Sequence, residues 1–201
     1  MEKKTNQRVM LTKQLIHKAF LQLLCEKGIR DISIRELCDQ AGVNRTTFYN
    51  HYGSQYDVFT EIAGQYLADI AAVIDSADVR NHPGVLAQVT LVLQYMAGHL
   101  ELSKILLNNH VDESFASRLF SLPKIGDMLA EALSEVKDPE EKEAITAFAI
   151  HGSYRLLQNW VNDPHRRNAE TASRLILELA GRVCARREQT VTTLKRERDS
   201  L

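Results

Sequence analysis

The residue types best suited to chemistry lie in one short run between residues 44 and 51. The run reads NRTTFYNH, and all its side chains except Phe48 can donate or accept hydrogen bonds. Short hydroxyls and amides reach base edges, and arginine, tyrosine and histidine reach phosphates. This suits a helix that lies in the major groove of double-stranded DNA. The candidate DNA-binding side chains in the run are Arg45, Thr46, Thr47, Tyr49, Asn50 and His51.

A second helix and a sharp turn are expected just before this run. Ser33 and Glu36 have the spacing of a capping box, in which each side chain satisfies a backbone N–H group of a first helical turn. Gly42 can end that helix in the left-handed conformation, and Asn44 can cap the next one. Together with a small residue at Cys38 and an apolar one at Phe48, the spacing favours a helix-turn-helix over residues 33–52. The alternative is a helical hairpin with a purely structural role.

Other chemistries find little support in the sequence. The seven histidines include no pair at i, i+4 and no HExxH motif, and the three cysteines are far apart without a CxxC pair, so no metal site is expected. Motifs such as GxSxG, GxGxxG and the P-loop do not occur, so we expect neither an enzyme nor a cofactor. The N-terminus has no apolar signal region, and no run approaches about 18 apolar residues. We therefore expect a cytoplasmic protein with no membrane segment.

Charge is divided unequally along the chain of 201 residues. Residues 1–53 hold nine Lys or Arg against five Asp or Glu, whereas the rest holds 16 against 21. A basic N-terminal part on an acidic body would attract nucleic acid toward one end of the molecule. The alternative is a chance fluctuation of charge.

Apolar periodicity predicts an all-α protein with two domains. Residues 1–8 are expected to form a loose basic arm, followed by a helix over 9–27 that Gly28 ends. With the two helices of 33–52 this gives a three-helix N-terminal helix-turn-helix domain, residues 1–53. Residues 54–201 are expected to form a C-terminal helical bundle for ligand binding and dimerisation. The predicted N-terminal core is Phe20, Leu24, Ile34, Leu37, Val43, Phe48 and Tyr52.

Within residues 54–201, a stripe from Val58 to Ile74 predicts one long helix. A helical segment over 109–136 is expected to break near Pro123. Asp138 followed by Pro139 is a strong helix start, and the helix that follows to about 161 is apolar on two faces, which requires two neighbours. Five residues are candidates to contact a ligand, although satisfied histidines and core aromatics are the commoner outcome. They are His99, His110, Phe115, Tyr154 and Trp160.

Residues from about 12 to 62 resemble the N-terminal domain of the TetR family of transcriptional regulators. The resemblance is carried by IHKAFLQLLCEKGIRDISIRELCDQAGVNRTTFYNHYGSQYDVFTEI. A shorter stretch, AFAIHGSYRLLQNWVND, is similar to the penultimate helix of a subgroup linked to regulation of dihydroxyacetone kinase genes.

The resemblance implies an all-helical homodimer of about nine helices per chain, joined through the last two helices, about 139–161 and 168–186. It also implies that the helix after Gly42 enters the major groove and that Ser33 caps its helix toward a phosphate. Gln55 stands where the family usually has a phosphate-gripping lysine, so it keeps a hydrogen bond but loses the charge. Arg45 or the arm carrying Lys3 and Lys4 could compensate.

The expected function is a ligand-responsive repressor that binds a palindromic operator as a homodimer, with a small-molecule effector. Two alternatives remain open at this point. The same fold could act as a coactivator through a protein partner, or the chain could be a helical enzyme or interaction module whose first domain plays no part in its activity.

Overall fold

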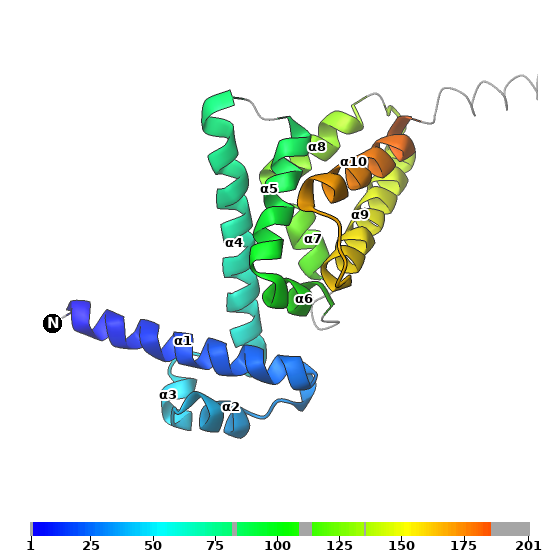
Figure 1. The fold of residues 1–201 in the computed structure, drawn as a ribbon. Helices are drawn as coiled ribbons and strands as arrows, with labels where there is room; N and C mark the ends of the chain where they lie inside the picture. The colour runs from blue at the N-terminus through cyan, green and yellow to red at the C-terminus, as the bar shows by residue number, and fades with distance from the viewer. Residues whose placement is uncertain (1, 82–83, 109–113, 135, 186–201) are drawn as a thin grey trace, which may run out of the picture. The chain divides into compact units, whose positions relative to one another are not determined.

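The computed structural model describes residues 2–81, 84–108, 114–134 and 136–185, and this part of the chain is helical without strands (Figure 1). The expected all-α fold class is therefore confirmed. The described residues form two compact units. Unit 1 comprises residues 1–69 and 101–113, and unit 2 comprises residues 70–100 and 114–201. These units divide the chain differently from the predicted boundary at residue 53, and that functional boundary stays a prediction.

Unit 1 is built from short helices that pack against one long N-terminal helix, α1. Residues 2–8 already belong to α1, so the expectation of a loose arm there was wrong. Leu11 and Leu15 of α1 are exposed, whereas the neighbouring Ile16 is fully buried. The elements are α1 (Glu2–Glu26), the 3-10 turn η1 (Ile29–Asp31), α2 (Ile34–Ala41), α3 (Arg45–Tyr49), the start of α4 (Gln55–Asn81) and α6 (Leu100–Asn108).

The turn between α2 and α3 has the predicted local causes. The Ser33 hydroxyl accepts a hydrogen bond from the Glu36 N–H at 3.2 Å, which starts α2. The reciprocal half of the capping box does not form, because the Glu36 carboxylate instead accepts a hydrogen bond from Lys27. Gly42 ends α2 with φ +66°, a left-handed conformation that costs a residue with a Cβ about 1 to 2 kcal/mol. Asn44 then accepts from the Thr47 N–H at 2.7 Å and starts α3.

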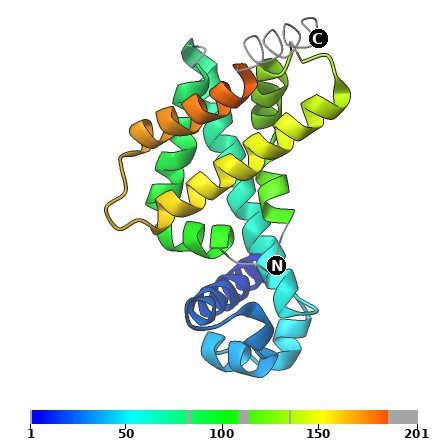
Figure 2. The same ribbon diagram turned by 90° about the vertical axis from the view of Figure 1, so that its right-hand side faces the viewer.

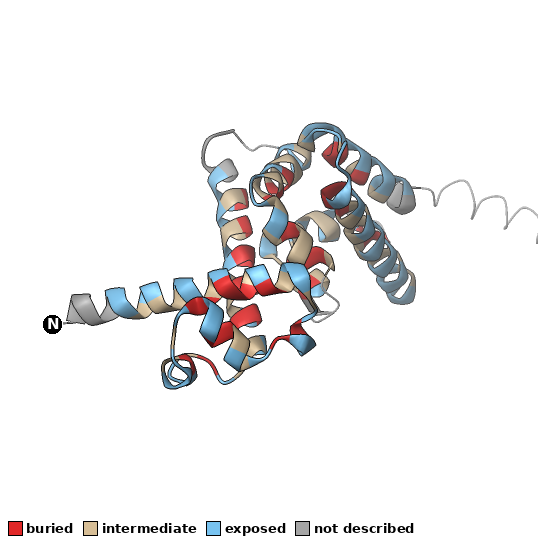
Figure 3. Ribbon diagram, turned by 60° about the horizontal axis from the view of Figure 1, so that its bottom comes forward, coloured by how far each residue is buried: buried red, intermediate tan, exposed pale blue. Residues whose placement is uncertain are grey.

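The core of unit 1 lies where α1, α2 and α3 meet (Figure 3). Phe20, Leu37 and Phe48 are fully buried and Tyr52 nearly so, as predicted. The other predicted core residues, Leu24, Ile34 and Val43, are only half-buried. A hydrogen bond of 2.6 Å between the Tyr66 and Ser103 hydroxyls links α4 to α6, and burial raises the pKa of Tyr66 to about 12.

Unit 2 is a bundle in which α10 packs against both α5 and α9 (Figure 2). Asp138 caps α9 by accepting a hydrogen bond from the Glu140 N–H at 3.0 Å, with Pro139 at the first helical position. Pro123 begins α8, which confirms the predicted break before it. The helices are the remainder of α4, α5 (Val85–Gly98), α7 (Ser114–Phe120), α8 (Pro123–Ala132), α9 (Pro139–Asn162) and α10 (Ala169–Ala185).

Candidate functional site

The helix α3 and the turn after it carry a compact polar surface on unit 1. Arg45, Thr46 and Asn50 are exposed, and 57% of Tyr49 is accessible. Thr47 and His51 are half-buried. We expected Asn50 and His51 to lie on the helix. The helix ends at Tyr49, however, and these two residues belong to the turn that follows it. The predicted DNA-binding residues from Arg45 to His51 therefore lie on α3 and on the turn after it.

Phe48 anchors this segment. Its ring is fully buried and packs edge-on against Tyr49 and obliquely against Tyr52, with ring centroids 5.5 and 5.7 Å away. Because Phe48 points into the core, its polar neighbours on α3 are turned away from it. The backbone N–H of Tyr52 bonds to the Phe48 carbonyl at 2.9 Å, which holds the turn after α3 close to this anchor.

Tyr52 joins α1 to the segment after α3. Its hydroxyl lies 2.8 Å from Nε2 of His17, and the ammonium of Lys13 lies over its ring at 5.3 Å. Lys13 also forms an ion pair of 2.8 Å with Glu61 of α4. Burial lowers the pKa of His17, and Lys13 lowers it further, against the opposing attraction of the Glu61 carboxylate. The tyrosine is therefore buried in the scaffold, as predicted, and its hydrogen bond there is an additional finding.

The two remaining candidates for phosphate contact lie at helix starts. The exposed Ser33 is the N-cap of α2, and the half-buried Gln55 is the first residue of α4. At the start of α4 the Asp57 carboxylate accepts hydrogen bonds from the N–H groups of Gly53 and Ser54, at 2.8 and 3.1 Å. The helix is thus capped by its own acid, which leaves two fewer N–H donors there for a phosphate.

The five candidate ligand residues of the body do not form one site among the described residues. His99 is exposed, and its Nδ1 lies 3.0 Å from the Tyr95 carbonyl oxygen. Phe115 is fully buried, and Tyr154 is half-buried. Trp160 is buried and donates its indole N–H to the Arg167 carbonyl at 2.8 Å, with the Arg166 guanidinium over its ring. His110 lies outside the described residues.

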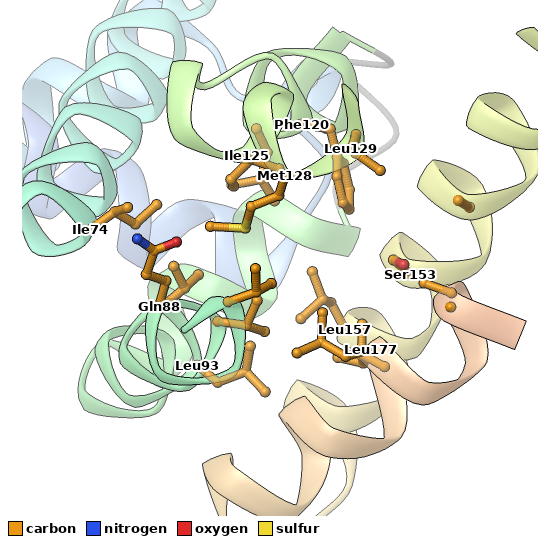
Figure 4. A pocket seen from close by; sticks show the side chains of 18 of the residues that line it. Ile74, Gln88, Leu93, Phe120, Ile125, Met128, Leu129, Ser153, Leu157 and Leu177 are labelled. Carbon is orange, nitrogen blue, oxygen red and sulfur yellow. The ribbon is translucent and has the colours of Figure 1, made fainter. Parts of the chain in front are cut away.

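Unit 2 contains an apolar cavity that none of the four described candidates lines (Figure 4). Its volume is about 340 Å³, and its walls come from α4, α5, α7, α8, α9 and α10. Sequence reasoning missed it because its walls are apolar stripes from helices far apart in the chain, and each stripe alone reads as core. The available signals were the polar residues Gln88 and Ser153 within such stripes. Lining side chains include Ile74, Leu93, Phe120, Met128, Leu157 and Leu177.

The helices α9 and α10 also carry exposed apolar side chains. Phe148 on α9 is 65% exposed, and Leu175 and Leu179 on α10 are each more than a third exposed. Gly152 follows Phe148 by one helical turn and is itself exposed, with nothing within 4 Å of the position its Cβ would occupy. Exposed apolar groups gathered on two neighbouring helices are typical of a surface that another chain covers.

Two further observations concern the described residues only. No helix among them is long and apolar enough to cross a membrane. No group of three His, Cys, Asp or Glu side chains among them is placed to hold a metal ion.

Two families match the chain, one in each half. Residues 16–62 match the family described as bacterial regulatory proteins, tetR family, and residues 86–181 match the transcriptional regulator C-terminal region. Among curated proteins, 83 residues are 30% identical to the uncharacterized HTH-type transcriptional regulator YxbF of Bacillus subtilis, and 62 residues are 36% identical to the HTH-type transcriptional regulator AcrR of Shigella flexneri. These segments cover 41% and 31% of this chain but only 21% and 29% of those two relatives.

Solved structures share the fold over most of the chain. A TetR transcriptional regulator from Streptococcus agalactiae superposes with a TM-score of 0.71 at 20% identity, covering 90% of this chain and 99% of that one. The dihydroxyacetone kinase operon activator DhaS superposes with a TM-score of 0.52 at 18% identity, covering 85% and 94%. The two matched families account for most of both the helix-turn-helix and the C-terminal bundle, and they describe regulators, not enzymes. The chain belongs to the TetR family of transcriptional regulators.

Proposed function

We propose that the protein is a ligand-responsive repressor that binds a palindromic operator as a homodimer. The observation that carries this proposal is the polar surface of α3, where Arg45, Thr46, Tyr49 and Asn50 are exposed beside the buried anchor Phe48. A short helix held by one apolar anchor can enter a major groove while its outward side chains contact bases and phosphates. Such a function requires a cytoplasmic location.

Phosphate binding in this proposal depends more on Arg45 than on the start of α4. Gln55 carries no charge, and the Asp57 carboxylate already occupies nearby N–H groups. Arg45 is the first residue of α3 and is exposed, so its guanidinium can contact a phosphate from the edge of the groove. Ser33, Thr47 and His51 are proposed as further contacts around it.

Dimerisation through α9 and α10 is supported by the exposed Phe148, Leu175 and Leu179. Gly152 would let two α9 helices approach closely, because it has no side chain on that exposed face. A two-fold axis through this four-helix contact would present two copies of α3 to half-sites about one helical turn, roughly 34 Å, apart. The palindrome of the operator would mirror that axis.

The cavity of unit 2 is the proposed effector site. An effector that prefers one conformation of the dimer shifts the population toward it, and DNA affinity changes by linkage. Residues of α9 and α10 both line the cavity and carry the proposed dimer surface, so a ligand could alter the pairing of subunits. A second candidate is a coactivator that acts through a protein partner. This candidate is suggested by the similarity to DhaS, which is named as an operon activator. The similarity to DhaS is limited to the fold.

Fluorescence anisotropy with the upstream region of its own gene tests the proposal. We expect tighter binding to that duplex than to a scrambled duplex, with an affinity that falls steeply as salt rises. Arg45→Ala should weaken binding and reduce the slope of log K against log salt by about two, because each of the two subunits loses one phosphate contact. Arg30→Ala is the matched control, because Arg30 is exposed on η1 outside the α3 surface. Equal affinity for both duplexes, with no response to salt, would refute DNA recognition.

A further inference from the structure

The cavity of unit 2 has the size of a small-molecule site and walls that are almost entirely hydrocarbon. Its volume of about 340 Å³ falls within the range of about 300 to 1,000 Å³ typical of ligand sites. Aliphatic side chains line most of it, with Phe120 as an aromatic wall and Met128 as a flexible one (Figure 4). A ligand body that fills this space would be apolar, since burial of apolar surface is its main source of affinity.

Two uncharged polar side chains interrupt the hydrocarbon lining. Gln88 comes from α5 and Ser153 from α9, and in Figure 4 they lie on opposite sides of the lining. Both are half-buried, and neither side chain hydrogen-bonds another described residue. The Gln88 amide can donate and accept, and so can the Ser153 hydroxyl. A ligand with a carbonyl, amide or hydroxyl group at one or both ends could therefore be oriented by them.

The charges around the cavity discriminate against ions. Glu131 is the one charged residue among its described lining residues, and Glu131 is exposed. A buried anion would have no cationic partner there and would be repelled by this carboxylate. A buried cation would gain little from Glu131, because solvent screens an exposed charge.

We propose that the cavity binds an uncharged molecule with an apolar ring or chain body and one or two hydrogen-bonding groups. Its space suffices for roughly ten non-hydrogen atoms when each is given the volume of a liquid water, about 30 Å³, and for more when they are covalently joined. This inference rests on the proposed role of the cavity as the effector site. It assigns a chemical class of effector to that site.

A matched pair of dyes tests the inference on the full-length protein. N-phenyl-1-naphthylamine is uncharged, and 8-anilino-1-naphthalenesulfonate has the same ring systems with an added sulfonate. We expect a saturable fluorescence increase with one uncharged dye per chain, and binding of the sulfonate weaker by about tenfold or more. Equal or tighter binding of the sulfonate, or no saturable binding of the uncharged dye, would overturn the inference.

A substitution in the cavity lining tests whether the dye binds in the cavity. Ser153→Leu adds hydrocarbon to the space and should weaken binding of the uncharged dye by about tenfold or more. Ser117→Leu, an exposed serine of α7 that does not line the cavity, is the control and should leave binding unchanged. If Ser153→Leu retains a wild-type circular dichroism spectrum and wild-type dye affinity, the dye binds elsewhere and the inference fails. The comparison of the two dyes on the wild-type protein stands even if this variant does not fold.

DNA binding of the same preparation separates the two proposals. A protein that binds its upstream DNA but not the uncharged dye would refute the effector class alone. A protein that binds the dye but not the DNA would refute the proposed repressor function and support the ligand class.

Discussion

The hydroxyl of Tyr52 lies 2.8 Å from Nε2 of His17, a residue 35 positions earlier in the chain. This contact joins the middle of α1 to the residue that follows the polar turn after α3. Lys13, above the tyrosine ring, and its partner Glu61 on α4 extend the same cluster. The orientation of the proposed DNA-reading segment therefore depends on a hydrogen bond that lies outside it.

Removing the Tyr52 hydroxyl should loosen this attachment. We expect Tyr52→Phe to lower the free energy of unfolding by about 1 kcal/mol, because His17 and the Glu61 carboxylate both lose a hydrogen-bonding partner in a half-buried site. Urea denaturation followed by circular dichroism measures the change. Tyr49→Phe is the control: Tyr49 is exposed, so its stability should change by less than about 0.5 kcal/mol. Equal losses in the two variants would show that the hydrogen bonds of the Tyr52 hydroxyl contribute nothing to stability.

The same cluster predicts how stability depends on pH. Burial holds the pKa of His17 below its ordinary value of about 6.5, so between the two values the unfolded chain binds more protons than the folded one. Stability from this group is thus complete above pH 6.5 and is lost as pH falls toward the folded pKa. Urea unfolding at pH 7.5 and 5.5 should show a smaller loss in His17→Gln than in the wild type. An identical loss in both would contradict the assignment to His17.

A side chain at Gly42 should destabilise the protein through the backbone conformation and not through packing. A Cβ at Gly42 would meet nothing within 4 Å, but the φ of +66° strains any residue that has one. We expect Gly42→Ala to destabilise the protein by about 1 to 2 kcal/mol in urea denaturation. Gly126→Ala is the control, since it lies in α8 with equally open space and an ordinary φ, and it should stabilise by roughly 0.5 to 1 kcal/mol. Two changes of the same sign would show that the backbone conformation of Gly42 is not what matters.

The proposed dimer surface can be broken by one charge. Phe148→Glu should convert the dimer to a monomer in sedimentation velocity, because a carboxylate would be buried without a partner at the contact between subunits. Met10→Glu, which alters a residue of similar exposure on α1, should leave the dimer intact. A wild-type protein that sediments as a monomer would contradict dimerisation itself. A Phe148→Glu protein that remains dimeric would place the interface elsewhere.

Local signals predicted the element boundaries that matter for the site. Ser33 and Gly42 set the limits of α2, and Asp138 with Pro139 sets the start of α9, because caps and breakers act through neighbouring residues. What depends on distant residues was not predictable in this way. The carboxylate of Glu36 bonds to Lys27 and not to the backbone, which no local pattern reveals.

The same distinction between local signals and distant contacts applies to the candidate functional sites. The segment after Gly42 could be predicted because its polar side chains and its anchor Phe48 are adjacent in sequence. The cavity could not, since it is formed by six helices whose spatial order the periodicity does not contain. Trp160, a candidate for ligand contact, is buried and donates its indole N–H to the Arg167 carbonyl, and its contact with a ligand stays a prediction.

Dimethyl sulfate footprinting on the upstream DNA tests the proposed recognition most directly. The reagent methylates the N7 atom of guanine in the major groove and the N3 atom of adenine in the minor groove. Insertion of two α3 segments predicts protection of guanine N7 in two clusters about one helical turn apart, with adenine N3 still reactive. Protection confined to adenine N3, or no protection at a protein concentration that saturates the duplex, would contradict major-groove recognition by this helix.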